Sequence, residues 1–149
     1  MAKRYPGSSS TAQFPARYRD NRDEEVMQAL VTAGALVALA DGRVEVIERD
    51  ELLNYIERQG LLPTMSRLDV AEAFDIRVRQ LQDRDSANVI VEAFQPLAGL
   101  SLASVVIRTA ERVAAADRQI HPGEVRALKL IRLIMITLPT RRSSAAFRR

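Results

Sequence analysis

The spacing of apolar residues restricts the fold of this chain more than any other feature. From residue 23 to residue 138, apolar side chains recur every three or four positions, and no segment has the alternating, β-branched pattern of a strand. This spacing predicts an all-helical (all-α) domain. The chain has 149 residues and no cysteine, which suits one compact domain and excludes disulfides and thiolate metal sites.

Capping and helix-breaking residues divide this region into six predicted helices. The second helix is expected to end at Gly60 and the fourth at Pro96, and the sixth is expected to start at Pro122. The third helix can be capped by either Thr64 or Ser66. The predicted helices span about 23–40, 46–59, 64–83 or 66–83, 86–95, 101–114 and 122–138. Beyond the first helix, the positions predicted to face the core are Leu52, Leu53, Ile56, Leu68, Ala71, Phe74, Val78, Leu81, Leu102, Val105, Val106, Thr109, Ala110, Val113, Ala114, Val125, Leu128, Ile131, Ile134, Met135 and Leu138.

The charges are divided unevenly along the sequence. Residues 1–22 hold five basic residues and one acid, and residues 139–149 hold four arginines, so each end carries +4. Because the whole chain carries +3, residues 23–138 carry −5. We therefore expect a flexible basic arm at 1–22, an acidic helical domain at 23–138 and a basic tail at 139–149.

The sequence predicts neither export nor a membrane span. Polar residues follow Lys3 and Arg4, which is unlike the apolar run of a signal peptide, and we expect a cytoplasmic protein. The longest apolar stretch, from Val26 to Ala40, is interrupted by two polar residues and is shorter than the roughly 18 to 20 residues that cross a bilayer. It predicts a buried helix.

The end of the first predicted helix is repeated 76 residues later, at the end of the fifth. Residues 37–52 read VALADGRVEVIERDEL, and the later segment reads VAAADRQIHPGEVRAL. In both copies an aspartate precedes a glutamate by seven residues, first as Asp41 and Glu48 and then as Asp117 and Glu124. We interpret this as an internal duplication of two helix–loop–helix units related by a pseudo-two-fold axis.

These residues resemble the signature of the tellurite-resistance TerB-like family, in which an apolar helix ends in Ala-Asp-Gly and the next helix carries a glutamate. Here the signature is Ala-Asp-Gly at 40–42 followed by Glu48, and it returns as Ala-Asp at 116–117 followed by Glu124. The resemblance covers the helical region and implies a pseudo-symmetric all-helical domain. It also implies acidic residues that bind divalent cations, and a role beside partner proteins in tellurite, metal or general stress responses. Arg118 departs from the family, which has glycine at this position.

The chemistry of the two loops gives a separate reason to expect a cation. Asp41 and Asp117 stand at helix C-termini, where a carboxylate is disfavoured by roughly 0.3–1 kcal/mol unless a cation neutralises it. Calcium, magnesium and manganese prefer carboxylate and carbonyl oxygens. The first loop is the better candidate because Arg118 brings an opposing charge to the second. The predicted ligands are Asp41, Glu45 and Glu48 in the first loop, and Asp117, Glu124 and His121 in the second.

A purely structural interpretation of the same acids stays open. Glu48 and Glu124 stand at the third position of their helices, from which a glutamate accepts a hydrogen bond from the amide of the capping residue. Asp41 and Asp117 can cap their own loops in Asx turns, and Gly42 can supply a positive φ. In this interpretation no metal is needed.

The residue content argues against an enzyme. His121 is the only histidine and is expected to be a helix cap or an exposed loop residue, and no glycine-rich phosphate loop or activated nucleophile is visible. We therefore expect a non-enzymatic module that binds a divalent cation and contacts a protein partner. Two alternatives are an interaction domain whose acidic loops are structural, and nucleic-acid binding through the arginine-rich ends.

Overall fold

The computed structural model describes residues 10–83 and 86–139, and over these residues the chain is all-helical, as predicted. They form six α-helices and one short 3₁₀ helix, and they contain no strand. The elements are α1 (Ser10–Ala38), η2 (Leu39–Asp41), α2 (Val46–Arg58), α3 (Arg67–Leu81), α4 (Ser86–Phe94), α5 (Leu102–Ala114) and α6 (Pro122–Thr137). Helices α2 to α6 begin and end close to their predicted bounds, whereas α1 is much longer than predicted.

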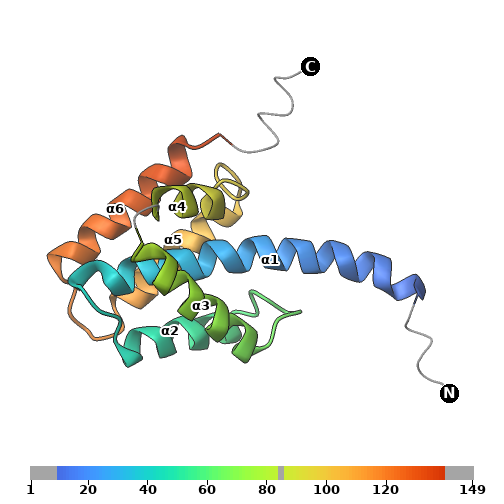
Figure 1. Ribbon diagram of the computed structural model, residues 1–149, viewed down its shortest axis with the longest axis horizontal. Helices are drawn as coiled ribbons and strands as arrows, with labels where there is room; N and C mark the ends of the chain where they lie inside the picture. Colours follow the sequence, from blue (N-terminus) through green and yellow to red (C-terminus); the bar gives the residue numbers. More distant parts are fainter. Residues whose placement is uncertain (1–9, 84–85, 140–149) are drawn as a thin grey trace.

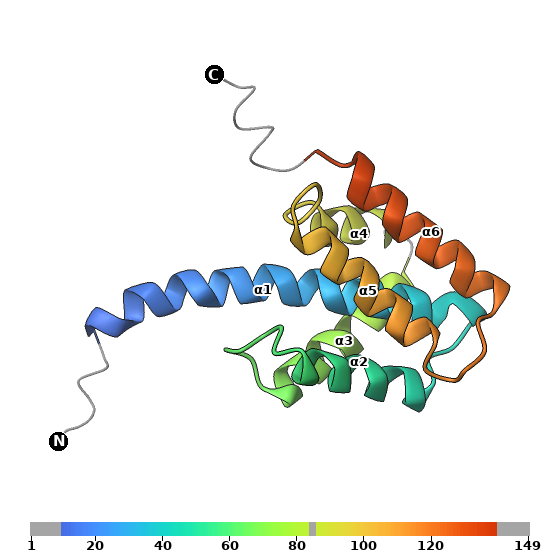
Figure 2. The ribbon, with the colours of Figure 1, turned by 180° about the vertical axis from the view of Figure 1, so that it is seen from behind.

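Helix α1 forms the centre of the domain. Helices α2 and α3 lie on one side of it, α4 and α6 lie on the opposite side, and α5 crosses it (Figures 1 and 2). The predicted buried stretch supplies the core, because Ala29, Leu30 and Val37 on this helix are fully buried. No helix in the described part of the chain is both long and apolar enough to span a membrane.

Local signals set the helix ends between α2 and α3. Gly60 has a φ of 59°, and the amide of Leu61 donates to the carbonyl of Ile56 at 3.1 Å, which is the hydrogen bond of a Schellman C-cap. The hydroxyl of Ser66 accepts from the amide of Asp69 at 3.1 Å and caps α3. The structure therefore selects Ser66 from the two predicted caps.

The predicted start of the first helix is wrong. Helix α1 begins at Ser10, not at residue 23, so residues 10–22 continue the helix where a flexible arm is expected. Alanine, arginine and glutamine in this segment favour helix, whereas Pro15 opposes it and donates no hydrogen bond. Extending an existing helix needs no new nucleus, and each residue other than proline can add one hydrogen bond. The remaining predicted arm and tail, at 1–9 and 140–149, lie outside the described residues.

Asp23 explains why that boundary is misleading. Its side chain is 8% exposed, and its Oδ2 accepts hydrogen bonds from the amide of Thr64 at 2.9 Å and from the Thr64 hydroxyl at 2.5 Å. The acid thus ties the loop before α3 to α1, and it does not mark a helix N-terminus. This contact joins residues 41 positions apart, so helix-start rules based on neighbouring residues cannot predict it.

Two residues predicted to face the core lie on the surface. Leu68 is 69% exposed and Val125 is 39% exposed, and each stands near the first turn of its helix, beyond the packed part of the bundle. Six others are only half-buried. These are Val78, Leu81, Leu102, Val105, Ile134 and Leu138. The remaining predicted core positions are buried.

Candidate functional site: two corners and a buried glutamate pair

The two predicted acidic loops, here called the first corner (41–48) and the second corner (117–124), each turn at one residue with a positive φ. Gly42 has a φ of 107°, and Arg118 at the matching position has a φ of 65°. Their amides donate to the carbonyls of Leu39 at 2.9 Å and Ala115 at 3.0 Å, which are also 76 residues apart. Arg118 therefore adopts a left-handed conformation that L side chains disfavour.

Each corner leads into a helix whose third residue is a buried glutamate. Oε1 of Glu48 accepts from the amide of Glu45 at 3.1 Å, and Oε1 of Glu124 accepts from the amide of His121 at 2.8 Å. Glu45 and His121 are the N-caps of α2 and α6, so the predicted capping geometry of both glutamates and the predicted place of His121 are confirmed. The glutamates are only 2% and 0% exposed, which is rare for carboxylates.

The two buried glutamates meet inside the domain. Burial is the largest cause that raises the pKa of Glu48 to about 7; the amide of Glu45 opposes it, and the contact with Glu124 and the charges of Glu124 and Asp41 add to it. Two ionised carboxylates offer only acceptors, so their contact is a hydrogen bond only when one carries a proton. Without that proton, Oε2 of Glu124 is buried with no hydrogen-bond partner. A proton or a cation is needed to offset the burial of the pair.

The other predicted ligands lie at the edges of this pair. Asp41 is exposed on η2, and its charge reaches Glu48. Asp117 is held by its own corner: Oδ1 accepts from the amide of Gln119 at 3.0 Å, and Oδ2 lies 3.4 Å from Nε2 of His121. The Asx turn expected at Asp117 is therefore present. The structure thus brings Glu48 and Glu124 together, while Asp117 is engaged elsewhere.

The number of carboxylates limits what kind of cation site is present. Among the described residues, no group of three or more histidine, aspartate or glutamate side chains is placed to hold a metal ion. A cation at the glutamate pair would need backbone or water oxygens as its further ligands, an arrangement that Mg²⁺ often adopts. Close packing of backbone is seen at the start of α6, where a Cβ added to Gly123 would lie 2.5 Å from the carbonyl oxygen of Ala40.

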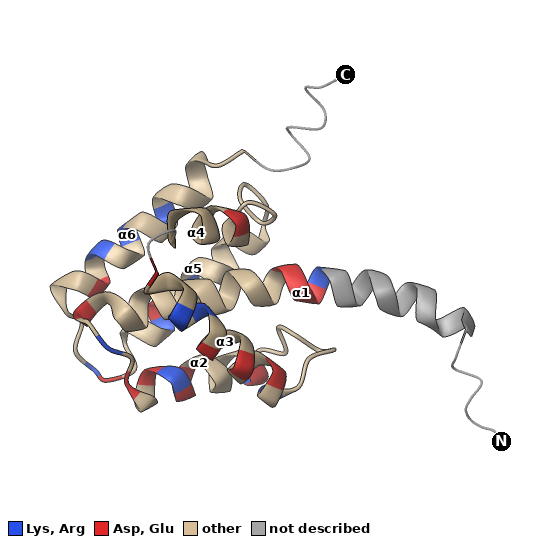
Figure 3. Cartoon of the chain, in the orientation of Figure 1, with Lys and Arg blue, Asp and Glu red and all other residues tan. Residues whose placement is uncertain are grey.

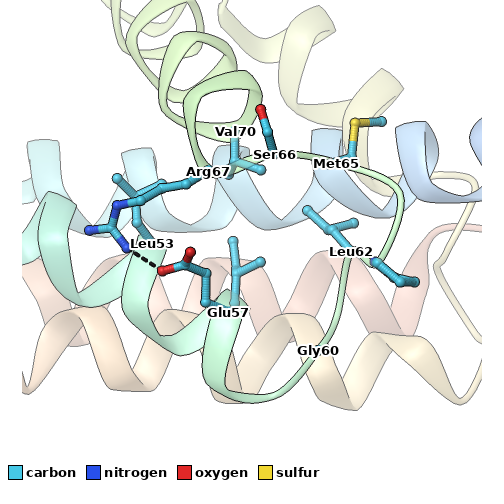
Figure 4. Close-up of a pocket in the computed structure, with 10 residues that line it drawn as sticks. Leu53, Glu57, Gly60, Leu62, Met65, Ser66, Arg67 and Val70 are labelled. Carbon is cyan, nitrogen blue, oxygen red and sulfur yellow. Dashed lines mark hydrogen bonds and ion pairs between the residues drawn. The ribbon is translucent and has the colours of Figure 1, made fainter.

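Two pockets that the sequence does not predict lie within the part of the chain that the structure describes. One, of about 280 Å³, opens between the end of α2 and the start of α3, where apolar side chains lie beside the ion pair of Glu57 and Arg67 (Figure 4). The other, of about 340 Å³, lies between α1, α3 and α4 and is lined by Arg77 and Glu92 among others. Burial lowers the pKa of Arg77, and its Nε has no hydrogen-bond partner. Neither pocket includes a predicted ligand.

The contact between Glu48 and Glu124 is the feature of the candidate site that sequence reasoning missed. The signal that could have predicted it is the sequence repeat: if a two-fold axis related the two copies, a residue close to that axis would meet its own equivalent. Spacing alone places each glutamate on its own helix and says nothing about the distance between them. That distance depends on how α2 and α6 each pack against α1 and α5.

Comparisons with known proteins do not extend this description. No protein-family model matches the chain, and no curated protein and no solved structure is significantly similar to it. The fold and the site therefore define the class: an all-helical domain in which two helix N-termini bring a pair of buried glutamates together. The resemblance to the TerB-like family rests on the motif residues alone.

Proposed function

We propose that this chain is a non-enzymatic TerB-like module that binds a divalent cation at the Glu48–Glu124 pair and acts, beside a protein partner, in tellurite, metal or general stress responses. The observation that carries the cation proposal is the buried Oε2 of Glu124, which has no hydrogen-bond partner and belongs to a carboxylate that contacts Glu48. A divalent cation displaces the shared proton and neutralises both carboxylates.

The geometry of the carboxylates supports this site. In each glutamate, Oε1 is held by a backbone amide, so the side chain cannot turn away from its partner without losing that bond. Preorganised oxygens lose little conformational entropy when an ion binds. The charge of Asp41 reaches Glu48, and Glu45 belongs to the same corner, so both acids attract the ion while backbone or water oxygens complete its ligands.

The internal duplication is part of this proposal. Turn residues with positive φ and corresponding loop hydrogen bonds, both at an offset of 76 residues, support it. The packing of the helices also supports it: α1 contacts both α2 and α6, and α5 contacts the same two helices. If α1 corresponds to α5 and α2 to α6, these contacts are equivalent in pairs. A cation near the pseudo-two-fold axis would then join the two halves.

Thermal unfolding of metal-free protein with calcium, magnesium, manganese or chelator tests the cation site. We expect one of these ions to stabilise the protein by about 2–3 kcal/mol when its concentration is one hundred times Kd. Glu124→Gln and Glu48→Gln should abolish the effect, and Asp41→Ala should remove most of it. Glu72→Gln, at an exposed acid on α3, is the matched control and should respond like the wild type.

The capping hydrogen bonds favour a second candidate, an interaction domain in which the acids are structural. In that case no divalent ion changes the unfolding temperature, while Glu124→Gln still raises stability at neutral pH because it removes a buried charge. That pair of results contradicts cation binding. Nucleic-acid binding through the ends is a weaker proposal, and a binding constant that does not change between 50 and 200 mM salt would exclude it.

A further inference from the structure

The outer face of α6 carries apolar side chains that the domain leaves uncovered. Leu130, Leu133 and Ile136 are 43%, 58% and 78% exposed, and we call these three residues the α6 outer stripe. The opposite face of the same helix is buried at Ile131 and Met135. Large apolar side chains that are exposed together often mark an interaction site.

The position and spacing of the stripe suit a second helix. Helix α6 lies at the edge of the molecule in both views, with its outer face turned away from the other helices (Figures 1 and 2). Arg126 and Leu133 are seven residues apart, as are Lys129 and Ile136, so these side chains form a seam of heptad spacing. A partner helix can pack along such a seam.

The charges around the stripe indicate the chemistry of its occupant. Arg126 and Lys129 are exposed beside the stripe, and Arg132 on the same helix pairs with Glu111. Residues 102–138 hold six basic and three acidic residues, a net charge of +3. Figure 3 shows basic residues along α6, in contrast to the acids that gather on α2. An acidic partner complements this surface.

The same surface disfavours two other occupants. In a pair of α6 helices from two copies of this chain, Arg126 and Lys129 would meet a second basic surface, and like charges oppose such a pairing. An anionic membrane would gain only three exposed apolar side chains, and binding at a lipid surface scales with buried apolar area.

We propose that the α6 outer stripe docks an amphipathic helix of a partner protein, with leucine-like residues against Leu130, Leu133 and Ile136 and with glutamate or aspartate beside Arg126 and Lys129. This docking surface does not depend on the cation site. A fluorescent peptide of about three heptads, with leucine along one face and glutamate on both flanks, is the probe. Its anisotropy is measured against the full chain at low and high salt. A peptide of the same composition with scrambled order is the control probe.

Substitutions in the stripe separate docking from general damage. Leu133→Ser and Ile136→Ser should each weaken peptide binding by about tenfold. Each substitution removes a large apolar side chain that is about half or more exposed in the free protein and that the bound peptide would bury. Leu68→Ser, at a residue that is 69% exposed on α3, is the matched control and should leave binding unchanged. Lys129→Glu should weaken binding, and added salt should do the same for the wild type.

The proposal is overturned if the acidic peptide does not bind, or if the scrambled peptide binds equally well. It is also overturned if Leu68→Ser weakens binding as much as Leu133→Ser. Vesicles containing phosphatidylglycerol that bind the wild type but not Ile136→Ser, without peptide binding, would assign the stripe to a membrane. Dimers in sedimentation that Ile136→Ser dissociates would assign it to a second copy.

Discussion

The first and second corners share a backbone but differ in what surrounds it. Both turn through a positive φ, and both lead to a buried glutamate that accepts from its N-cap amide. At the turn, however, the first corner has Gly42 and the second has Arg118. Asp41 is exposed, whereas Asp117 is held by Gln119 and His121. The shared features, the positive φ and the capping glutamate, form the turn and start the next helix. The corners differ at the turn residue and at the aspartate, close to the acids predicted to bind a cation.

A second difference concerns how tightly the two helix N-termini pack. Ile47, the second residue of α2, is 48% exposed. Its counterpart in α6 is Gly123, which leaves no space for a Cβ beside the carbonyl of Ala40. The start of α6 is thus pressed against the end of η2, while the start of α2 is open to solvent.

The largest expected effect concerns pH and the pair that both corners share. The pKa of Glu48 is raised from 4.5 to about 7 in the folded protein, so the folded state binds more protons than the unfolded state between these values. Stability is therefore greatest below pH 4.5 as far as this group is concerned, and it is lost as the pH rises through 7. We expect a loss of about 2–3 kcal/mol between pH 5 and pH 8.

Denaturant titrations at both pH values measure this loss. Glu48→Gln should remove most of the dependence, because the amide does not ionise in this range. Glu72→Gln, at an exposed acid, should keep it. If the unfolding free energy of Glu48→Gln depended on pH as strongly as that of the wild type, the glutamate pair would not hold the proton.

Gly123→Ala tests the difference in packing between the corners. An alanine usually stabilises a helix relative to glycine, but here its Cβ would lie 2.5 Å from a backbone oxygen. We expect destabilisation by about 2 kcal/mol. Ile47→Ala, at the matching position of α2, should cost much less because that side chain is half exposed. Equal effects of the two variants in thermal unfolding would remove the proposed asymmetry.

Arg118→Gly tests whether the second corner carries backbone strain that the first avoids. Arg118 has a φ of 65°, and glycine adopts this conformation without a Cβ penalty. The substitution should stabilise the protein by about 1 kcal/mol, and Gly42→Ala should destabilise it by a similar amount. If the two substitutions changed the unfolding free energy in the same direction relative to the wild type, this interpretation would be contradicted.

The smallest effect separates the two aspartates. Asp117→Ala loses the hydrogen bond from the Gln119 amide and the contact with His121, and should cost about 0.5–1 kcal/mol in chemical denaturation. Asp41→Ala should slightly raise the stability of metal-free protein, because it removes a negative charge from a helix C-terminus and from the surroundings of Glu48, and it should remove most of the response to divalent ions. A larger stability loss at Asp41 than at Asp117 would reverse the roles assigned to the two corners.

Most helix boundaries could be predicted because their signals are local. Gly60, Ser66 and Pro122 each act through a dihedral preference or a hydrogen bond within one turn, and the structure confirms the boundary that each predicts. The start of α1 could not be predicted in this way. Asp23 has the appearance of an N-terminal helix acid, yet its partner is Thr64 in a distant loop.

The candidate site likewise has features that the local sequence predicts and features that it does not. The seven-residue spacing from aspartate to glutamate, and the position of Glu48 and Glu124 at the third residue of their helices, follow from the order of residues. The sequence by itself therefore determined the all-helical class, the caps and the two corners, because these depend on short-range hydrogen bonds and on the period of the apolar residues. Only the tertiary structure decided that the two glutamates meet in the interior. It also left the α6 outer stripe exposed and turned Leu68 and Val125 to the surface. Burial and the pKa of a carboxyl group depend on contacts between segments far apart in the chain, which no local pattern encodes.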